Sequence, residues 1–184
     1  MRGQVCVALV VSTLFVFAAC SDDDGGSESS ADTRRSPAAA SVPDGSACEL
    51  FTEGEAADVL GGAVRREMDL GGTEASTCTY VGEDDATRAL GLGAGTFESD
   101  EAADNAFRRA RADAQFDGLE IEDVPDLGAD AYWLPESNNF ERTISDQELT
   151  YGELDVRVGN RVLTAFVTPS NRDAARAIAE LTLG

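Results

Sequence analysis

The chain of 184 residues contains no histidine, and all 14 of its basic residues are arginine. Without histidine, Ser- or Cys-based catalytic triads and His-ligated zinc or haem sites are excluded. Without lysine, Schiff-base chemistry, Ser–Lys dyads and the P-loop lysine are excluded as well. Any catalysis would therefore depend on carboxylates, on Tyr, Ser or Thr hydroxyls, or on a cation that these groups bind.

Positive charge is scarce, because the 14 arginines face 35 Asp and Glu residues and the net charge is −21 at pH 7. A strongly negative field repels phosphate backbones and anionic headgroups, so we expect no nucleic-acid partner. An acidic surface is most often simply a solvated one. The hydrophobic content of 42% is enough for the core of one domain.

No apolar run is long enough to span a bilayer, which takes about 20 residues. The longest run, residues 5–19, follows Arg2 and ends at Phe17-Ala18-Ala19-Cys20. This ending resembles the lipobox of bacterial lipoproteins. The resemblance implies that residues 1–19 are a signal peptide and that Cys20 carries the lipid at the mature N-terminus. An uncleaved anchor and ordinary secretion are the alternatives.

Residues 20–46 combine this lipidated cysteine with a segment rich in Asp, Ser, Gly, Ala and Pro, in which Val42 is the one sizeable apolar side chain. Such a composition predicts a disordered tether that spans roughly 25–30 Å. Asp22-Asp23-Asp24 lacks the ligand spacing of a calcium loop, so we expect no metal site there. The predicted location is the outer face of the cytoplasmic membrane.

Two cysteines remain for the folded part, because Cys6 leaves with the signal peptide and Cys20 is acylated. Cys48 and Cys78 form a matched pair in an oxidising compartment, which predicts a disulfide. Closing a loop of about 31 residues should stabilise the domain by roughly 3–4 kcal/mol. The spacing fits neither a metal site nor a redox-active Cys-x-x-Cys pair.

The first half of residues 47–184 shows a short helix followed by strands. Thr52-x-x-Glu55 is a capping-box pattern that predicts a helix up to Leu60. Strand-like alternation follows at residues 64–70 and 78–80. In residues 89–97, large residues alternate with Gly91, Gly93 and Gly95, which predicts a strand with one bare face. We expect a neighbouring helix rather than a ligand to pack there, and the spacing does not fit a dinucleotide-binding loop.

A longer helix completes the first half, and the second half repeats the order of a Leu-Gly pair, strands and an Ala-rich helix. A helix should run from Ser99 or Asp100 to Phe116, and a short strand should cover residues 131–134, before a loop at residues 135–139. Alternation on both sides of Gly159-Asn160 predicts a hairpin, and Ser170 is the expected cap of the last helix. The apolar stripes expected on the two helices comprise Ala103, Phe107, Ala110, Ala114 and Ala174, Ile178, Leu181. We therefore predict an α+β two-layer domain, an antiparallel sheet with helices on one face, whose halves are candidate pseudo-repeats.

Several short motifs carry a family resemblance: Cys48-Glu49-Leu50, Cys78-Thr79-Tyr80 and the turn from Val124 to Tyr132. With these motifs, the chain resembles actinobacterial lipoprotein domains of unknown function. It is also distantly similar to the extracellular sensor domains of receptor Ser/Thr kinases. The resemblance implies a surface-anchored α+β module with a ligand-sensing role, and it supplies no catalytic residues.

We therefore expect a lipid-anchored, non-enzymatic binding or sensor-like module without a cofactor or metal ion. Its partners would be the membrane, through the lipid, and an unknown small ligand or envelope protein. The candidate ligand-binding residues are Asp126, Asp130, Tyr132 and Trp133, although core packing is the alternative for the two aromatics. The alternative functions are an accessory or inhibitory subunit and a cell-wall hydrolase that uses two carboxylates.

Overall fold

The computed structural model describes residues 44–184 except 73, 145 and 146, and it describes no side chains at residues 138–150. The predicted signal peptide, Cys20 and nearly all of the tether lie outside the described residues. Among the described residues, no helix is long and apolar enough to cross a membrane.

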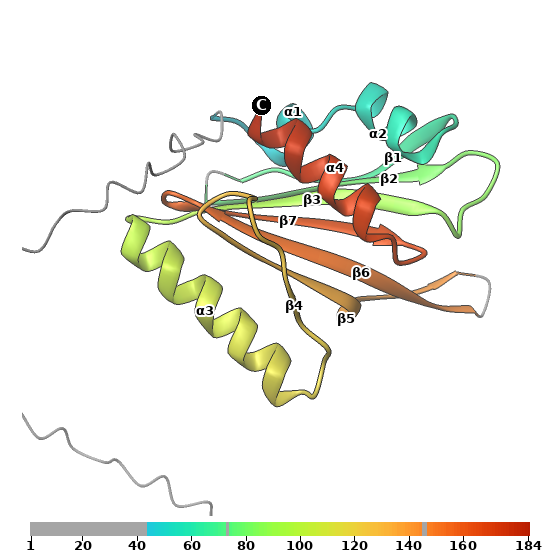
Figure 1. Ribbon diagram of the computed structural model, residues 1–184. Helices are drawn as coiled ribbons and strands as arrows, with labels where there is room; N and C mark the ends of the chain where they lie inside the picture. Colours follow the sequence, from blue (N-terminus) through green and yellow to red (C-terminus); the bar gives the residue numbers. More distant parts are fainter. Residues whose placement is uncertain (1–43, 73, 145–146) are drawn as a thin grey trace, which may run out of the picture. The chain divides into compact units, whose positions relative to one another are not determined.

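A seven-stranded antiparallel sheet organises the described part of the chain (Figure 1). Its spatial order is β1-β2-β3-β7-β6-β5-β4, so the central pair, β3 and β7, joins the two halves of the sequence. The strands are β1 (Val64–Leu70), β2 (Ala75–Gly82), β3 (Ala89–Thr96), β4 (Glu122–Asp123), β5 (Asp130–Ile144), β6 (Gln147–Val158) and β7 (Arg161–Thr168). The helices are α1 (Ala47–Leu50), α2 (Glu53–Leu60), α3 (Asp100–Phe116) and α4 (Arg172–Leu183).

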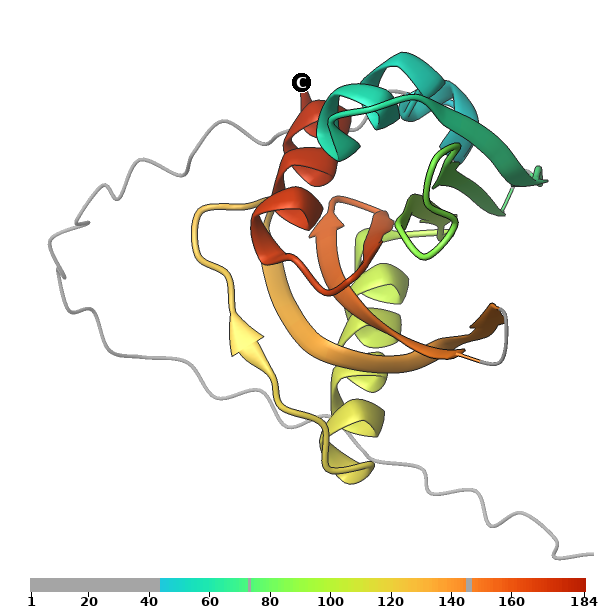
Figure 2. The same ribbon diagram turned by 90° about the vertical axis from the view of Figure 1, so that its right-hand side faces the viewer.

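Three of the helices cover one face of the sheet. In Figures 1 and 2, α1, α2 and α4 lie together on this face, where they enclose the main hydrophobic core. Phe51 near α1 and Ile178 on α4 are fully buried there against strand residues such as Leu92 and Leu154. This core is built from the alternate strand positions that point toward these helices.

Helix α3 lies alone on the opposite face (Figure 1). Its Phe107 and Ala114 form a second, smaller cluster with Tyr132 and Leu134 of β5. The predicted α+β class and antiparallel sheet are confirmed, whereas the helices occupy both faces instead of one. The pseudo-repeat is not confirmed, because α3 and α4, the helices that would correspond, cover opposite faces.

Most predicted element boundaries are confirmed, and the local chemistry explains them. The Thr52–Glu55 capping box begins α2, and Gly61 ends it with a left-handed φ of 69°. The Ser99 side chain caps α3 by accepting a hydrogen bond from the Ala102 amide. The hairpin between β6 and β7 turns at Gly159, whose φ is 57°.

Three local predictions are wrong. The loop expected at residues 135–139 is part of β5, which stays paired with β6 through register shifts between Leu134, Ser137 and Arg142. Such irregularities let a strand accommodate a proline. In α4 the cap is Asn171 rather than Ser170, and the buried face comprises Ala175, Ile178, Ala179 and Thr182. Leu181, expected on that face, is 46% exposed.

The predicted disulfide between Cys48 and Cys78 is present in the structure. It ties α1 to β2 across the main core, in which Cys78 is fully buried. The Tyr80 hydroxyl adds a second link by donating a hydrogen bond to the Phe51 carbonyl at 2.9 Å. The N-terminal helices are therefore fixed to the sheet by a covalent bond as well as by packing.

Candidate ligand-binding cavity

The structure does not bring the four predicted ligand-binding residues together. Trp133 belongs to the main core, where it packs so closely on Gly152 that a side chain there would overlap its ring. Tyr132, the preceding residue, points to the opposite face and packs in the α3 cluster. The separation follows from the alternation of side chains along a strand.

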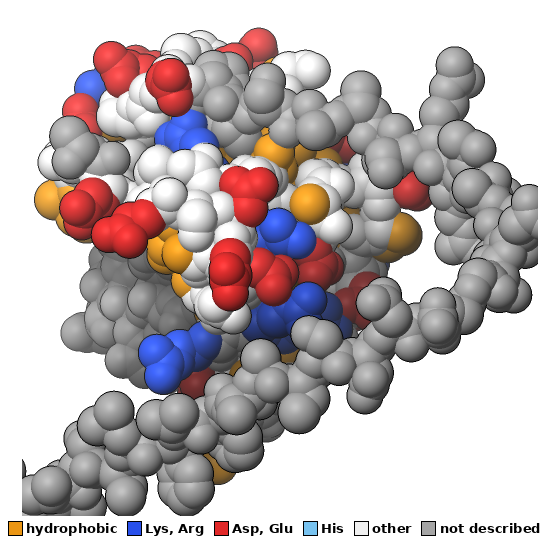
Figure 3. Space-filling view, turned by 90° about the vertical axis from the view of Figure 1, so that its left-hand side faces the viewer, with side chains coloured by type: hydrophobic (Ala, Val, Ile, Leu, Met, Phe, Trp, Pro, Cys, Tyr) orange, Lys and Arg blue, Asp and Glu red, His pale blue; other side chains and the backbone are white. Residues whose placement is uncertain are grey.

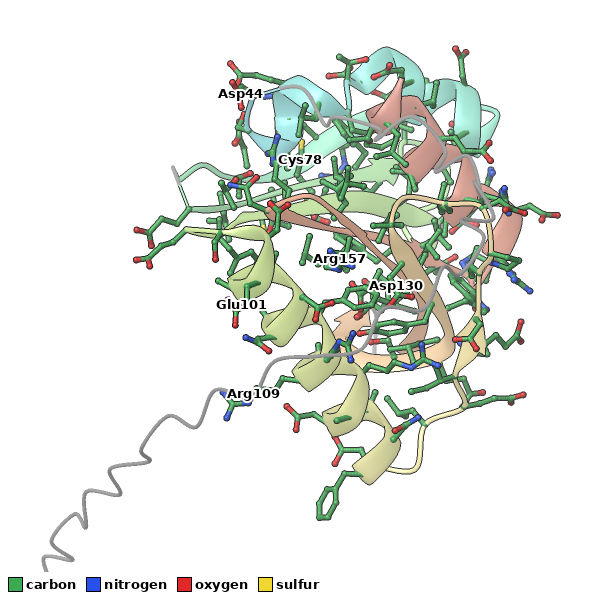
Figure 4. The ribbon with its side chains drawn as sticks, turned by 60° about the vertical axis from the view of Figure 1, so that its left-hand side comes forward. Asp44, Cys78, Glu101, Arg109, Asp130 and Arg157 are labelled. Atoms are coloured by element: carbon green, nitrogen blue, oxygen red, sulfur yellow. A yellow bond between two sulfur atoms is a disulfide. The ribbon has the colours of Figure 1, made fainter. Side chains whose placement is uncertain are left out.

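Asp126 lies in the turn that leads into β5, and Asp130 is the first residue of that strand. They line a hollow of about 180 Å³ formed by the residues of that turn. Asp126 has a left-handed φ of 64°, and Gly128 has a φ of 62°. Asp130 pairs in the sheet with Arg157, as their neighbouring positions in Figure 4 show.

A larger cavity, of about 410 Å³, lies between α3 and the sheet. Small residues leave this space open. On β3 it is bordered by Gly93 and Gly95, and on α3 by Ala106 and Ala110. The bare glycine face predicted from the sequence is therefore confirmed, but neighbouring side chains fill only part of it. The Phe166 ring occupies the space beside Gly91. At Gly93, in contrast, an added Cβ would meet nothing closer than 3.6 Å.

Two acidic residues of β6 line the cavity. Glu153 and Asp155 occupy alternate positions of the strand and so point to the same face, and their exposed fractions are 3% and 4%. The Thr164 hydroxyl donates a hydrogen bond to Asp155 Oδ1 at 2.5 Å. The Ser137 hydroxyl donates one to Glu153 Oε2 at 2.6 Å.

Burial perturbs the acid–base chemistry of this wall. Loss of hydration, followed by the nearby charge of Glu153, raises the pKa of Asp155 to about 7, against the opposing hydrogen bonds from Thr164 and Tyr132. Burial likewise raises the pKa of Tyr132, and the neighbouring Asp155 adds to this effect. Asp155 thus exchanges its proton near neutral pH, while Tyr132 remains a hydrogen-bond donor.

Aromatic rings form a second part of the cavity wall. Phe97, Phe107 and Tyr132 all line the cavity. The rings of Phe107 and Tyr132 lie 5.0 Å apart, measured between centroids. The guanidinium carbon of Arg111 lies 5.6 Å from the centroid of the Tyr132 ring, and Arg111 Nη2 is also 2.6 Å from Asp123 Oδ1.

Arg108, Arg111 and Arg157 form ion pairs with acids that do not line the cavity. Arg157 Nε lies 3.3 Å from Asp104 Oδ1, and Arg108 Nε lies 2.8 Å from Asp104 Oδ2. Arg109 lies on the outer side of α3 (Figure 4). Figure 3 shows arginine side chains interspersed with acidic ones on the face at the left of Figure 1. These ion pairs leave Glu153 and Asp155 as the charged groups among the described residues that line the cavity.

The arrangement combines an open, largely apolar hollow with aromatic side chains and two buried carboxyl groups. It can hold a small molecule and bind a cationic or hydrogen-bond-donating group at Asp155. In the described part of the chain, no cluster of three or more Cys, Asp or Glu side chains is suited to hold a metal ion.

Sequence analysis missed Glu153 and Asp155. The alternation of Leu154, Val156 and Val158 drew attention to the apolar face of the strand. The polar residues between them face solvent on most half-buried strands, so this pattern alone does not indicate a site. The available indication was the bare glycine face of β3, which required a covering element on the same side of the sheet.

Comparison with known proteins adds little to this picture. No family model matches the chain, and no curated protein matches it. Among solved structures, the chain is similar to the extracellular domain of PknH from Mycobacterium tuberculosis, with a TM-score of 0.47 and 10% sequence identity over 74% of this chain and 92% of that chain. The similarity is consistent with the distant resemblance to sensor domains.

Proposed function

We propose that the protein is a lipid-anchored, non-enzymatic module outside the cytoplasmic membrane that binds a small molecule between α3 and the sheet. The observation that carries this proposal is the cavity of about 410 Å³ with its buried polar wall. Small-molecule sites typically measure about 300–1,000 Å³ and combine apolar walls with a few placed polar groups.

The proposed location is supported by the N-terminal sequence and by the disulfide. Residues 1–19 match a signal peptide, and Cys20 follows the small residues that precede a lipidated cysteine. The Cys48–Cys78 disulfide suits an oxidising compartment. The tether of residues 20–46 would then hold the binding domain away from the outer face of the membrane.

Binding is favoured over hydrolysis by the placement of the two carboxylates. A glycosidase needs an acid and a base on opposite sides of the scissile bond, about 5–10 Å apart. Glu153 and Asp155 are next-but-one neighbours on one strand, and they point to the same face. Their side chains hydrogen-bond to each other, which is closer than the separation of two carboxyl groups that flank a scissile bond. We therefore expect no turnover on peptidoglycan or glycan panels.

Native mass spectrometry with two matched variants tests the proposal. The full chain, purified in detergent, would be mixed with phenylalkyl amines, alcohols and carboxylates of similar size. Ala106→Phe places a ring in the cavity, whereas Ala112→Phe adds the same ring on the exposed side of α3. We expect one-to-one complexes with the unchanged protein and with Ala112→Phe, but not with Ala106→Phe.

The opposite pattern would refute the binding function. Complexes that survive equally in both variants would place binding outside the cavity. If none of the three compound classes formed a complex with the unchanged protein, the cavity would not be a small-molecule site.

A further inference from the structure

We infer that the ligand of the cavity is an organic ammonium ion on a mainly apolar body, with its charged nitrogen held at Asp155. This inference rests on the proposed binding function and names the class of ligand. It follows from the charge of the wall, from the aromatic rings beside it and from the surroundings of Asp155.

The acidic residues of the cavity wall favour a positively charged ligand. The charged residues among the described lining are both acids, and both are almost fully buried. Burial makes the ionised form of a carboxyl group costly, and Asp155 responds by holding its proton more tightly. A ligand nitrogen that brings a positive charge would compensate Asp155, whereas a carboxylate or phosphate ligand would add to the repulsion.

The hydrogen bonds at Asp155 leave room for such a partner. Thr164 binds Oδ1, and an ionised carboxylate offers about four acceptor positions in all. Thr164 and Tyr132 donate hydrogen bonds to the carboxyl group, and Glu153 shares a hydrogen bond with it when Asp155 is protonated. A ligand nitrogen would take the place of that proton beside the two carboxyl groups. An ammonium group carries three hydrogens, so it can bind Asp155 and still reach a second acceptor on the wall.

The aromatic residues supply a second feature of ammonium sites. Phe97, Phe107 and Tyr132 line the same cavity as the carboxyl groups. Aromatic faces attract cations, and sets of them recognise organic ammonium groups in many proteins. The Tyr132 ring already has one cation, Arg111, at 5.6 Å.

Among the described side chains around Asp155, the arginines are already paired with other acids. Arg157 is paired with Asp104, and Arg111 is paired with Asp123. The groups that face this region comprise Tyr132 on β5, Glu153 and Arg157 on β6, and Asp104 and Arg111 on α3. The net charge of −21 further favours the approach of a cation.

Calorimetry with a pair of matched probes tests the inference. 2-Phenylethylamine and 2-phenylethanol have similar bodies and differ in charge. At about pH 8 and physiological salt, we expect the amine to bind the full chain at least about tenfold more tightly than the alcohol. Asp155→Asn should bring the ratio close to one, because the amide keeps an oxygen for Thr164 but carries no charge. Asp84→Asn, in the exposed turn between β2 and β3, removes the same charge elsewhere and should leave the ratio unchanged.

The pH dependence of amine binding to the unchanged protein provides a test that needs no variant. Because the amine binds the ionised carboxyl group, its affinity should fall about tenfold per pH unit below the pKa of Asp155, which is about 7, and stay level above it. The binding of the alcohol should not follow this profile.

Equal affinities for amine and alcohol, or an amine affinity that is the same at pH 5.5 and pH 8.5, would overturn the inference and leave the cavity as a site for neutral molecules. Failure of amines, alcohols and carboxylates alike to form complexes with the unchanged protein would overturn the proposed function itself. The two failures are therefore distinguishable.

Discussion

Asp155 is a carboxyl group held out of water on the wall of the cavity, and its proton links the site to the stability of the fold. An acid whose pKa is higher in the folded chain than in the unfolded chain binds its proton more tightly when folded. The free energy of unfolding therefore decreases as the pH rises from about 4 to about 7, and this contribution is level above that window.

We predict that Asp155→Asn removes this penalty. Since one pKa unit corresponds to about 1.4 kcal/mol, the variant should be more stable than the unchanged protein by roughly 2–4 kcal/mol near pH 8, and about equally stable near pH 4. Denaturant unfolding at both pH values measures the difference. A variant that is less stable near pH 8, or a difference that does not change with pH, would contradict the placement of a costly buried carboxylate.

Gly91 and Gly93 provide a second prediction at the scale of single residues. A Cβ at Gly91 would overlap the Phe166 ring and the Cys78 carbonyl oxygen, whereas at Gly93 the nearest atom would be Thr164 Cβ at 3.6 Å. Gly91→Ala should therefore lower the free energy of unfolding by roughly 1–3 kcal/mol. Gly93→Ala, on the same strand, should have little effect or stabilise slightly. Equal losses in the two variants would show that the cavity is not open at Gly93.

At the scale of elements, the sequence predicts the helices and strands well wherever a local pattern determines them. Capping residues and glycines mark the ends of α2 and α3, and alternation marks β3 and the hairpin at Gly159. The prediction fails where tertiary pairing overrides local chemistry. Residues 135–139 contain Pro135 and two asparagines, which favour a loop, but pairing with β6 keeps them in a strand.

The last helix offers a test of a cap that the sequence placed one residue too early. The Asn171 side chain accepts a hydrogen bond from the Ala174 amide at 3.1 Å. We predict that Asn171→Ala lowers the free energy of unfolding by about 1 kcal/mol, and that Ser170→Ala has a clearly smaller effect. Thermal unfolding of both variants checks this. A larger loss at Ser170 would restore the cap predicted from the sequence.

The cavity could not be predicted from any single element. Its carboxyl groups come from β6, its bare floor from β3 and its cover from α3. The chain order β3–α3 does not say which face of the sheet the helix covers, and the helix in fact lies opposite to α4. Because α3 covers this face of the sheet, Glu153 and Asp155 are buried instead of exposed to solvent.

At the scale of the whole molecule, the proposed anchor would hold the cavity at the outer face of the cytoplasmic membrane. Cys20→Ala should abolish the incorporation of a labelled fatty acid and release the protein from the membrane fraction, because a thiol is needed for lipid attachment. The control is Cys48→Ala, which should lower stability by roughly 2–5 kcal/mol through loss of the disulfide but leave the lipid label in place. Continued acylation of Cys20→Ala would contradict the anchor.

The central claim is that the space between α3 and the sheet binds a small ammonium ligand, and a crystal structure of the protein with 2-phenylethylamine tests it most directly. We predict density for the probe inside the cavity, with its ring against Phe107 and its nitrogen within about 3 Å of an Asp155 carboxyl oxygen. Density outside the cavity, or a probe whose nitrogen points away from both carboxyl groups, would contradict the account.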